Sequence, residues 1–302
     1  AGPGGGVGAN LSGAGIDAEV SSSGGLGSLR PETSRAKSIG VVFTPGGSDL
    51  SIAIDYFDIR VQDEVTKLGA ANIILGCYTS NSFPADPLCG LFTRTGPAGG
   101  NANNLDQVID NFLNIADQRN RGIDVTARWR HDIGNGTLAW NGQLTWQIKD
   151  TVALFDALPP VDTNGLVGDP KIVGNMETRY DIDDWTFQWS MQYVGESSDE
   201  QYCVETANCS GSAGTTTSAF SPYVAVVSTP GIFYHDFSVR KRIDDWSLLV
   251  GLANAFDQQP PRLTSEGFRA GAYQDISGTA VPGVSQYDLV GRRVFMNISK
   301  KF

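Results

Sequence analysis

Hydrophobic and polar residues alternate with a period of two along much of this 302-residue chain. Successive side chains of a β-strand point to opposite faces, so this alternation predicts strands with one apolar and one polar face. In the clearest segment, Leu138 and Trp140 share one face, and Asn141 and Gln143 share the other. The pattern occurs in nine segments, at 35–44, 49–62, 120–131, 137–149, 171–180, 185–194, 232–241, 246–255 and 289–302.

The connections between these segments alternate in length. The first, third, fifth and seventh are tight turns, such as Pro45-Gly46-Gly47-Ser48. The second, fourth, sixth and eighth are long and extend roughly over 63–119, 150–170, 195–231 and 256–288. Short turns at one rim and long loops at the other are typical of outer-membrane β-barrels, whose turns face the periplasm and whose loops face outside.

The polar face carries charges that a small sealed core could not hold without partners. Examples are Arg128, Arg130, Glu177, Arg179 and Arg240. An aqueous lumen would keep these charges hydrated, which turns the apolar face toward lipid. Aromatic residues near the strand ends suit the girdles at the two membrane interfaces. These aromatic residues are Trp129, Tyr180, Trp185, Tyr193 and Trp246.

A soluble fold is the alternative for these strands. In that case the apolar side chains would interdigitate in a sealed interior, among them Trp140, Leu144, Trp189 and Val250. No run of about 18 apolar residues is present, so the sequence predicts no transmembrane helix. Membrane strands escape such a search because their apolar residues alternate with polar ones.

Composition adds three constraints. The 36 glycines and the 18% of charged residues fit strands separated by turns and loops. The net charge of −11 argues against nucleic acid as a partner. Residues 1–34 begin with many glycines and lack the basic and apolar regions of a signal peptide. We interpret 1–34 as an external loop of a longer protein.

The four cysteines form two close pairs, Cys77 with Cys89 and Cys203 with Cys209, in segments rich in Gly, Ser, Asn and Thr. Such pairs predict two local disulfides and an oxidising compartment, although three connectivities are possible for four cysteines. Zinc binding is the alternative. It is disfavoured because no CxxC occurs and the histidines, His131 and His235, are distant in sequence. We therefore expect no metal site.

The end of the chain has its own pattern. Val294, Met296, Ile298 and Phe302 share one strand face, and the terminal residue is aromatic. Such an end resembles the signal that the barrel-assembly machinery recognises. Lys300 interrupts the apolar face, and its ammonium group could reach the rim because it lies two residues from the end.

Several short segments resemble motifs of one family, the TonB-dependent outer-membrane receptors. Residues 29–34, LRPETS, are similar to the family's L-K-P-E-x-S segment, and residues 55–59, DYFDI, to its D-Y-F-x-I strand. Residues 120–124, NRGID, resemble a strand start of the family. The segment 251–257, GLANAFD, followed by Pro260, resembles the N-L-F-D-x-x-P motif of the penultimate strand. Gly291-Arg292-Arg293 and Phe302 resemble the last strand.

The resemblance implies an all-β fold, an antiparallel transmembrane β-barrel. The segment 35–302 would supply about nine C-terminal strands of a barrel of about 22 strands. Neither the plug domain nor its TonB box has a counterpart in the chain. The implied partners are outer-membrane lipid, the plug and remaining strands from the same gene product or a second chain, the TonB complex acting through the plug, and the barrel-assembly machinery.

The function that the resemblance implies is active uptake of an iron chelate, a vitamin or an oligosaccharide. A passive porin and a non-transport surface protein, such as an adhesin or scaffold, remain alternatives. We expect neither an enzyme nor a bound cofactor, because no nucleophile motif accompanies either histidine and the segment GPGGGVG lacks the Lys-Ser/Thr of a phosphate loop.

Two external loops hold the candidate ligand-binding residues, which combine aromatic rings with hydrogen-bonding groups. The loop 63–119 contributes Tyr78, Phe83, Phe92 and Arg94, and the loop 257–287 contributes Arg262, Arg269, Tyr273 and Gln274. The alternative for each of these residues is contact with neighbouring loops alone. In the family that the chain resembles, members with asparagine-rich loops closed by a disulfide look suited to carbohydrate, so the resemblance favours carbohydrate among the three ligand classes.

Overall fold

The computed structural model describes residues 19–21, 29–96, 103–153, 160–200, 228–263, 272–274, 280–282 and 286–301. Each of the nine segments predicted from alternation contains a strand. The strands are β2 (Thr33–Phe43), β3 (Leu50–Lys67), β6 (Phe112–Ile133), β7 (Gly136–Ala153), β9 (Ile172–Ile182), β10 (Trp185–Val194), β13 (Ile232–Ile243), β14 (Trp246–Ala253) and β17 (Arg293–Lys300).

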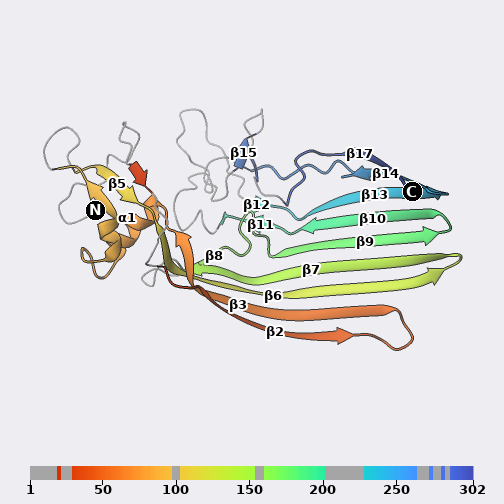
Figure 1. Ribbon diagram of the computed structural model, residues 1–302, viewed down its shortest axis with the longest axis horizontal. Helices are drawn as coiled ribbons and strands as arrows, with labels where there is room; N and C mark the ends of the chain where they lie inside the picture. The colour runs from red at the N-terminus through yellow and green to blue at the C-terminus, as the bar shows by residue number, and fades with distance from the viewer. Residues whose placement is uncertain are drawn as a thin grey trace. The chain divides into compact units, whose positions relative to one another are not determined.

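These strands form one antiparallel sheet with the order β2-β3-β6-β7-β9-β10-β13-β14-β17 (Figure 1). Each strand pairs with its neighbour in the chain, which is the up-and-down topology of a barrel wall. The short strand β8 (Val161–Asp162) pairs with the end of β7. Within the described ranges, β2 and β17 are the two edges and are not paired with each other, so the sheet is open.

The chain divides into two compact units. The first comprises 1–36, 59–119 and 151–162, and the second comprises 37–58, 120–150 and 163–302. The second unit therefore holds most of the strand wall, and the first holds the loop that connects β3 to β6. In the described ranges, no helix has the length and apolar character needed to cross a membrane.

The apolar side chains form one continuous face in the second unit. The register places Trp189 opposite Phe237, and Val250 opposite both Val239 and Met296. This face is open, because Leu144 and Val250 are 40% and 43% exposed. The soluble alternative, in which these residues interdigitate in a sealed interior, is therefore wrong.

The buried residues of the second unit lie on the other side of the sheet. Val194, Ile232, Tyr234 and Tyr287 form a small core cluster. Val194 and Ile232 face each other at the loop end of the β10–β13 pair, on the side that carries the polar residues. The larger apolar surface is thus left open, as is typical of a face that meets lipid.

Lysines on the apolar face lie against tryptophans at the turn end of the sheet. Lys241 Nζ lies 4.7 Å from the ring centre of Trp185, and Lys300 Nζ lies 5.2 Å from that of Trp246. Each lysine stands directly opposite its tryptophan on the neighbouring strand. The position of Lys300 agrees with the expectation that its ammonium group reaches the rim, where aromatic side chains concentrate.

Polar side chains pair across the opposite face. Thr145 Oγ1 donates to Asp124 Oδ1 at 2.6 Å, and Arg179 Nε lies 2.8 Å from Asp181 Oδ2. Arg128 and Arg130 are exposed. Of the charges that argued against a sealed core, Arg179 is therefore paired, and Arg128 and Arg130 are open to solvent.

The last predicted segment, 289–302, is correct as a strand but begins too early. Residues 289–292 form a bend, and β17 starts at Arg293. The bend is held by Asp288, whose Oδ1 accepts hydrogen bonds from Val290 N at 2.9 Å and from Arg293 Nη1 at 2.7 Å. Val294, Met296 and Ile298 share the apolar face of β17, while Phe302 lies outside the described residues.

Asp288 makes a pH-dependent contribution to this bend. Partial burial acts to raise the pKa of Asp288, but hydrogen bonds from Arg293, Val290 and Asn254 outweigh it and hold the pKa below its ordinary value of 3.8. A lowered folded-state pKa adds stability above the unfolded value, and that stability is lost as pH falls through the folded-state pKa.

We therefore expect Asp288→Asn to lower the unfolding midpoint of the full-length receptor above about pH 5. The difference from wild type should shrink as the pH falls below 3.8 and disappear below the folded-state pKa, where the wild-type carboxylate is also protonated. Thermal unfolding followed by gel mobility across this pH range measures the effect. If the difference in unfolding midpoint between the variant and the wild type stays constant down to the lowest pH, the pH-dependent role of the Asp288 carboxylate is contradicted.

Candidate functional site

The loop between β3 and β6 folds into a small structure of its own. It contains the helix α1 (Ala70–Thr79), the 3-10 helix η1 (Pro87–Leu91) and the strands β4 (Phe92–Arg94) and β5 (Leu105–Ile109). The strand β1 (Glu19–Ser21) pairs with β5 in parallel, which gives the order β1-β5-β4. Leu68, Ile73 and Val108 form the core, so the predicted loop 63–119 is a packed element.

A disulfide joins Cys77 of α1 to Cys89 of η1, as the spacing predicts. Cys77 is buried, and the bond closes a segment with a sequence separation of 12. Asp86 supports the same segment, because its carboxylate accepts hydrogen bonds from Ser80 Oγ at 2.6 Å and from Leu88 N at 2.9 Å. The second predicted pair, Cys203 with Cys209, lies outside the described residues.

Removing this disulfide should loosen the loop and leave the strand wall folded. By loop-closure entropy the bond contributes about 3 kcal/mol. We expect Cys77→Ser with Cys89→Ser to increase chymotrypsin cleavage within 70–96 by at least about tenfold. Mass spectrometry of the fragments provides the measurement. If the double variant is cleaved no faster than the wild type, the core of Leu68, Ile73 and Val108 holds the loop without help from the disulfide.

The four candidate residues of this loop lie together. The Tyr78 ring centre is 5.2 Å from that of Phe83 and 6.0 Å from that of Phe92. Arg94 Cζ lies 5.9 Å from the ring centres of Tyr78 and Phe92. Its Nη2 donates to Tyr78 Oη at 2.9 Å, and its Nη1 donates to the carbonyl oxygen of Asn103 at 2.7 Å.

This aromatic–arginine cluster suits a polar, planar ligand. The rings are half-buried, while Arg94 is exposed. A guanidinium group has five N–H donors, so it retains donors for a ligand beside the contacts described above. The same contacts also satisfy the alternative, in which the loop residues only hold one another. Ligand binding by Tyr78, Phe83, Phe92 and Arg94 remains a prediction.

The second set of candidate residues is described only in part. Arg262 is exposed. The backbones of Tyr273 and Gln274 belong to β15 (Ala272–Gln274), which pairs with β16 (Ala280–Pro282). Arg269 and the side chains of Tyr273 and Gln274 lie outside the description. This set stays a prediction.

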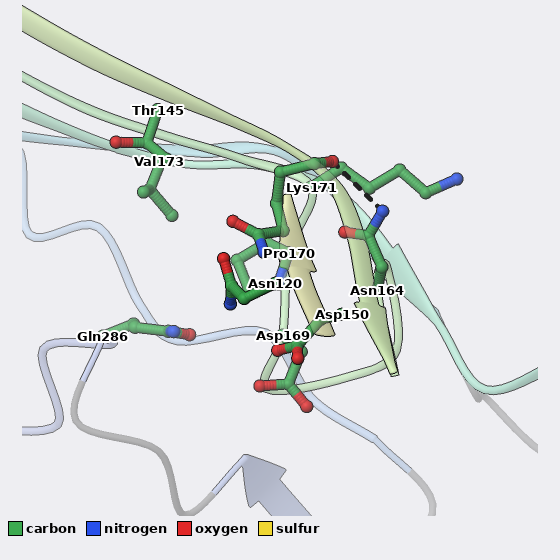
Figure 2. A pocket seen from close by; sticks show the side chains of 10 residues that line it. Asn120, Thr145, Asp150, Asn164, Asp169, Pro170, Lys171, Val173 and Gln286 are labelled. Atoms are coloured by element: carbon green, nitrogen blue, oxygen red, sulfur yellow. Dashed lines mark hydrogen bonds between the residues drawn. The ribbon is translucent and has the colours of Figure 1, made fainter. Parts of the chain in front are cut away.

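The second unit contains a polar pocket of about 180 Å³, which the sequence analysis missed (Figure 2). Its wall is the polar face of β6, β7 and β9 near the long-loop end of the sheet. A turn over 163–170 and Gln286 complete it. The lining residues are Asn120, Thr145, Gln147, Asp150, Asn164, Asp169, Pro170, Lys171, Val173 and Gln286.

Backbone hydrogen bonds hold the turn 163–170 against the wall. Thr163 N donates to the carbonyl oxygen of Asp150 at 2.8 Å, and Asn164 Nδ2 donates to that of Gln147 at 3.1 Å. Gly165 has a φ of +91°, and a Cβ at this position would lie 2.7 Å from Lys171 Cε. The positive φ therefore favours glycine, and any larger residue would also have to displace the Lys171 side chain.

Long-range contacts complete the pocket. Gln286 Nε2 donates to the carbonyl oxygen of Gly168 at 3.0 Å, across 118 residues of sequence. Val167 N donates to Asp199 Oδ1 at 2.9 Å, and Asp199 is buried. The sequence analysis placed 163–170 in the long connection 150–170, but no local pattern indicated which residues this segment would contact.

The pocket lining is polar and on balance acidic. It contains the carboxylates of Asp150 and Asp169 and the ammonium group of Lys171. Figure 2 shows the Lys171 side chain extending away from Asn120 and the two carboxylates. In the described part of the chain, no three His, Cys, Asp or Glu residues are grouped closely enough to hold a metal ion.

The histidines occupy the apolar face. His131 stacks on Trp129 with ring centres 5.6 Å apart. His235 Nδ1 accepts a hydrogen bond from Trp189 Nε1 at 3.1 Å, and its ring stacks on the same tryptophan. These contacts give both histidines packing partners.

Comparison with known proteins gives the chain a family. The family model described as "TonB dependent receptor-like, beta-barrel" matches residues 5–255. A search of the curated proteins gave no match.

Two solved structures illustrate the likeness of fold. A mutant of the ferric enterobactin receptor PfeA from Pseudomonas aeruginosa is 17% identical, with a TM-score of 0.53 over 91% of this chain and 32% of that chain. The siderophore receptor PirA from Acinetobacter baumannii is 15% identical, with a TM-score of 0.52 and the same coverage. The chain thus spans about one third of the length of these receptors. Because the family model matches most of its length, the chain belongs to the TonB-dependent receptor β-barrel family.

Proposed function

We propose that this chain forms barrel wall and external loops of an active transporter in the outer membrane of a Gram-negative bacterium. The transporter takes up a scarce ligand with energy supplied through TonB. The observation that carries the proposal is the up-and-down sheet whose apolar face is open, combined with long loops confined to one end. The family match supports the same function.

In this proposal, residues 35–302 form wall and loops, and residues 1–34 belong to an external loop. The plug, the remaining strands and the TonB complex are its partners, and the barrel-assembly machinery recognises its C-terminal strand. The aromatic–arginine cluster of Tyr78, Phe83, Phe92 and Arg94 provides one ligand contact, and the polar pocket beside Asn120 provides another. The ligand is an iron chelate, a vitamin or an oligosaccharide.

Uptake by intact cells tests this function. Radiolabelled ferric enterobactin, cobalamin and maltotriose represent the three ligand classes. Each is supplied to wild-type cells, to cells lacking the gene and to cells lacking TonB. We expect accumulation of at least one compound to require both the gene and TonB. Gene-dependent uptake that persists without TonB would indicate a passive porin, and uptake unchanged by deletion of the gene would indicate a surface protein without a transport role.

A further inference from the structure

The polar pocket offers an unusual balance of hydrogen-bonding groups. Six of its side chains are amides or carboxylates, namely Asn120, Gln147, Asp150, Asn164, Asp169 and Gln286. Amides both donate and accept hydrogen bonds, whereas ionised carboxylates only accept them. A ligand that fills this pocket must therefore present several donors together with some acceptors.

Gln286 directs one such acceptor into the pocket. The side-chain Nε2 of Gln286 donates to the carbonyl oxygen of Gly168. The backbone carbonyl oxygen of Gln286 accepts from Gln192 Nε2 at 3.3 Å, so both the backbone and the side chain of this residue are held. Its Oε1 is buried and has no hydrogen-bond partner in the described part of the chain. Figure 2 shows the amide end turned toward the other lining side chains. A buried acceptor without a partner carries a cost that a ligand donor would remove.

Asn120 and Asp169 are available for a ligand as well. Among the described residues, neither side chain makes a hydrogen bond. Asp169 contributes to the turn through its backbone, since its N donates to Leu166 O at 2.9 Å and its O accepts from Gly165 N at 2.8 Å. Its carboxylate can therefore contact a ligand without being needed for the turn.

Charge and size restrict the ligand further. The Asp169 carboxylate faces the site, and the lysine extends away from it. A multiply anionic ferric chelate would be repelled, and its lost hydration would not be replaced. The volume of about 180 Å³ is below the range of about 300–1,000 Å³ typical of drug-sized ligands. It suits one small ring rather than a whole siderophore.

We infer that this pocket binds one sugar ring of a neutral oligosaccharide. The hydroxyl groups of the ring donate to Asp169 and to Gln286 Oε1, and they accept from the amide of Asn120. Hydroxyl groups supply both donors and acceptors without charge, which matches the lining. The inference rests on the proposed uptake function and names the substrate class of the same transporter.

Binding to the purified full-length receptor tests the inference. The probes are an array of neutral oligosaccharides that includes maltotriose, cellotriose and xylotriose. Ferric enterobactin and calcium chloride are also tested, as an iron chelate and a divalent cation that could bind in place of a sugar. We expect at least one neutral oligosaccharide to bind. Asn120→Ala and Asp169→Asn should each weaken that binding by about tenfold, the effect of losing one or two ligand hydrogen bonds. Gln143→Ala is the matched control, because Gln143 lies on the same face of β7 outside the pocket, and it should leave binding unchanged.

Three results would overturn the inference. The first is an array on which no neutral oligosaccharide binds. The second is sugar binding that Asn120→Ala and Asp169→Asn leave unchanged. The third is binding of ferric enterobactin or calcium that depends on these two residues.

The failure of uptake is distinguishable from the failure of the sugar site. If uptake of cobalamin or ferric enterobactin depends on TonB and is unchanged by the pocket substitutions, the transport function is supported and the sugar site is contradicted. If sugar binding depends on the pocket residues but no compound is taken up in a TonB-dependent way, the sugar site is supported and the transport function is contradicted.

Discussion

Replacing Val250 by arginine is expected to lower the free energy of unfolding of the membrane-embedded receptor by about 2–4 kcal/mol, the cost of arginine on the lipid face near the midplane. Val250 lies in the middle of β14, between Val239 and Met296, and is 43% exposed on the apolar face. In lipid, a guanidinium group at this position loses its hydration and finds no counter-charge. Urea unfolding in lipid vesicles measures the change.

Asn297→Arg is the matched control for this substitution. Asn297 is the neighbour of Met296 on β17 and stands opposite Leu249, so its side chain projects from the opposite face of the same strand pair. It is exposed, and an arginine there would remain in water, with an expected change within about 0.5 kcal/mol. Equal destabilisation by both substitutions would show that the apolar face does not meet lipid.

Replacing Asn254 by alanine is expected to destabilise the loop end of the β13–β14–β17 segment by about 3 kcal/mol. Asn254 is 1% exposed and follows β14 with a φ of +46°. Its Nδ2 donates to Gln258 O at 3.0 Å, and its Oδ1 accepts from Gln258 N at 2.8 Å. Its backbone N donates to Asp236 Oδ1 at 2.7 Å. Alanine would lose the side-chain bonds and would also be strained at positive φ.

Asn254→Gly separates these two causes. Glycine adopts positive φ without strain, so this variant should be about 1 kcal/mol more stable than Asn254→Ala while still lacking the side-chain bonds. Hydrogen exchange at the Gln258 amide reports the local opening, and urea unfolding reports the global change. If the Gln258 amide exchanges at the wild-type rate in both variants, Asn254 does not hold this turn.

The sequence motif around Asn254 gains a physical account from these contacts. Asp257, at the end of the same motif, accepts a hydrogen bond from Arg292 N at 2.9 Å. Asp288 binds Arg293 and receives a hydrogen bond from Asn254. The motif thus joins the end of β14 to the start of β17. The resemblance identified these residues, but only the structure shows which partners they bind.

Strand ends were harder to predict than strands. The sequence places the start of the third strand at 120, whereas β6 begins at Phe112. The additional residues are held by polar cross-strand contacts. Arg60 Nη2 lies 2.7 Å from Asp117 Oδ2, and Asn114 Nδ2 donates to Asp63 O at 2.7 Å. Such pairs break the apolar–polar alternation on which the prediction depends.

The helix α1 was missed for a related reason. A helix of ten residues is marginal by itself, so its sequence carries a weak signal. Its stability comes from Ile73 packed in a core with Leu68 and Val108, and from the disulfide to Cys89. The composition of the loop 63–119 therefore indicated the disulfide correctly, but not the packed element that brings Tyr78, Phe83, Phe92 and Arg94 together.

By itself, the sequence determined the nine strands, their two faces, the separation of short turns from long loops, and the pairing of Cys77 with Cys89. These are local properties, because a strand's two faces and a close cysteine pair are fixed by residues within a short stretch of chain. The tertiary structure alone decided the polar pocket, the bonds of Asn254 to Asp236 and Asp288, and the lysine–tryptophan contacts. Each joins residues that are distant in sequence, as Gly168 and Gln286 are, and only strand order and register bring such residues within hydrogen-bonding distance.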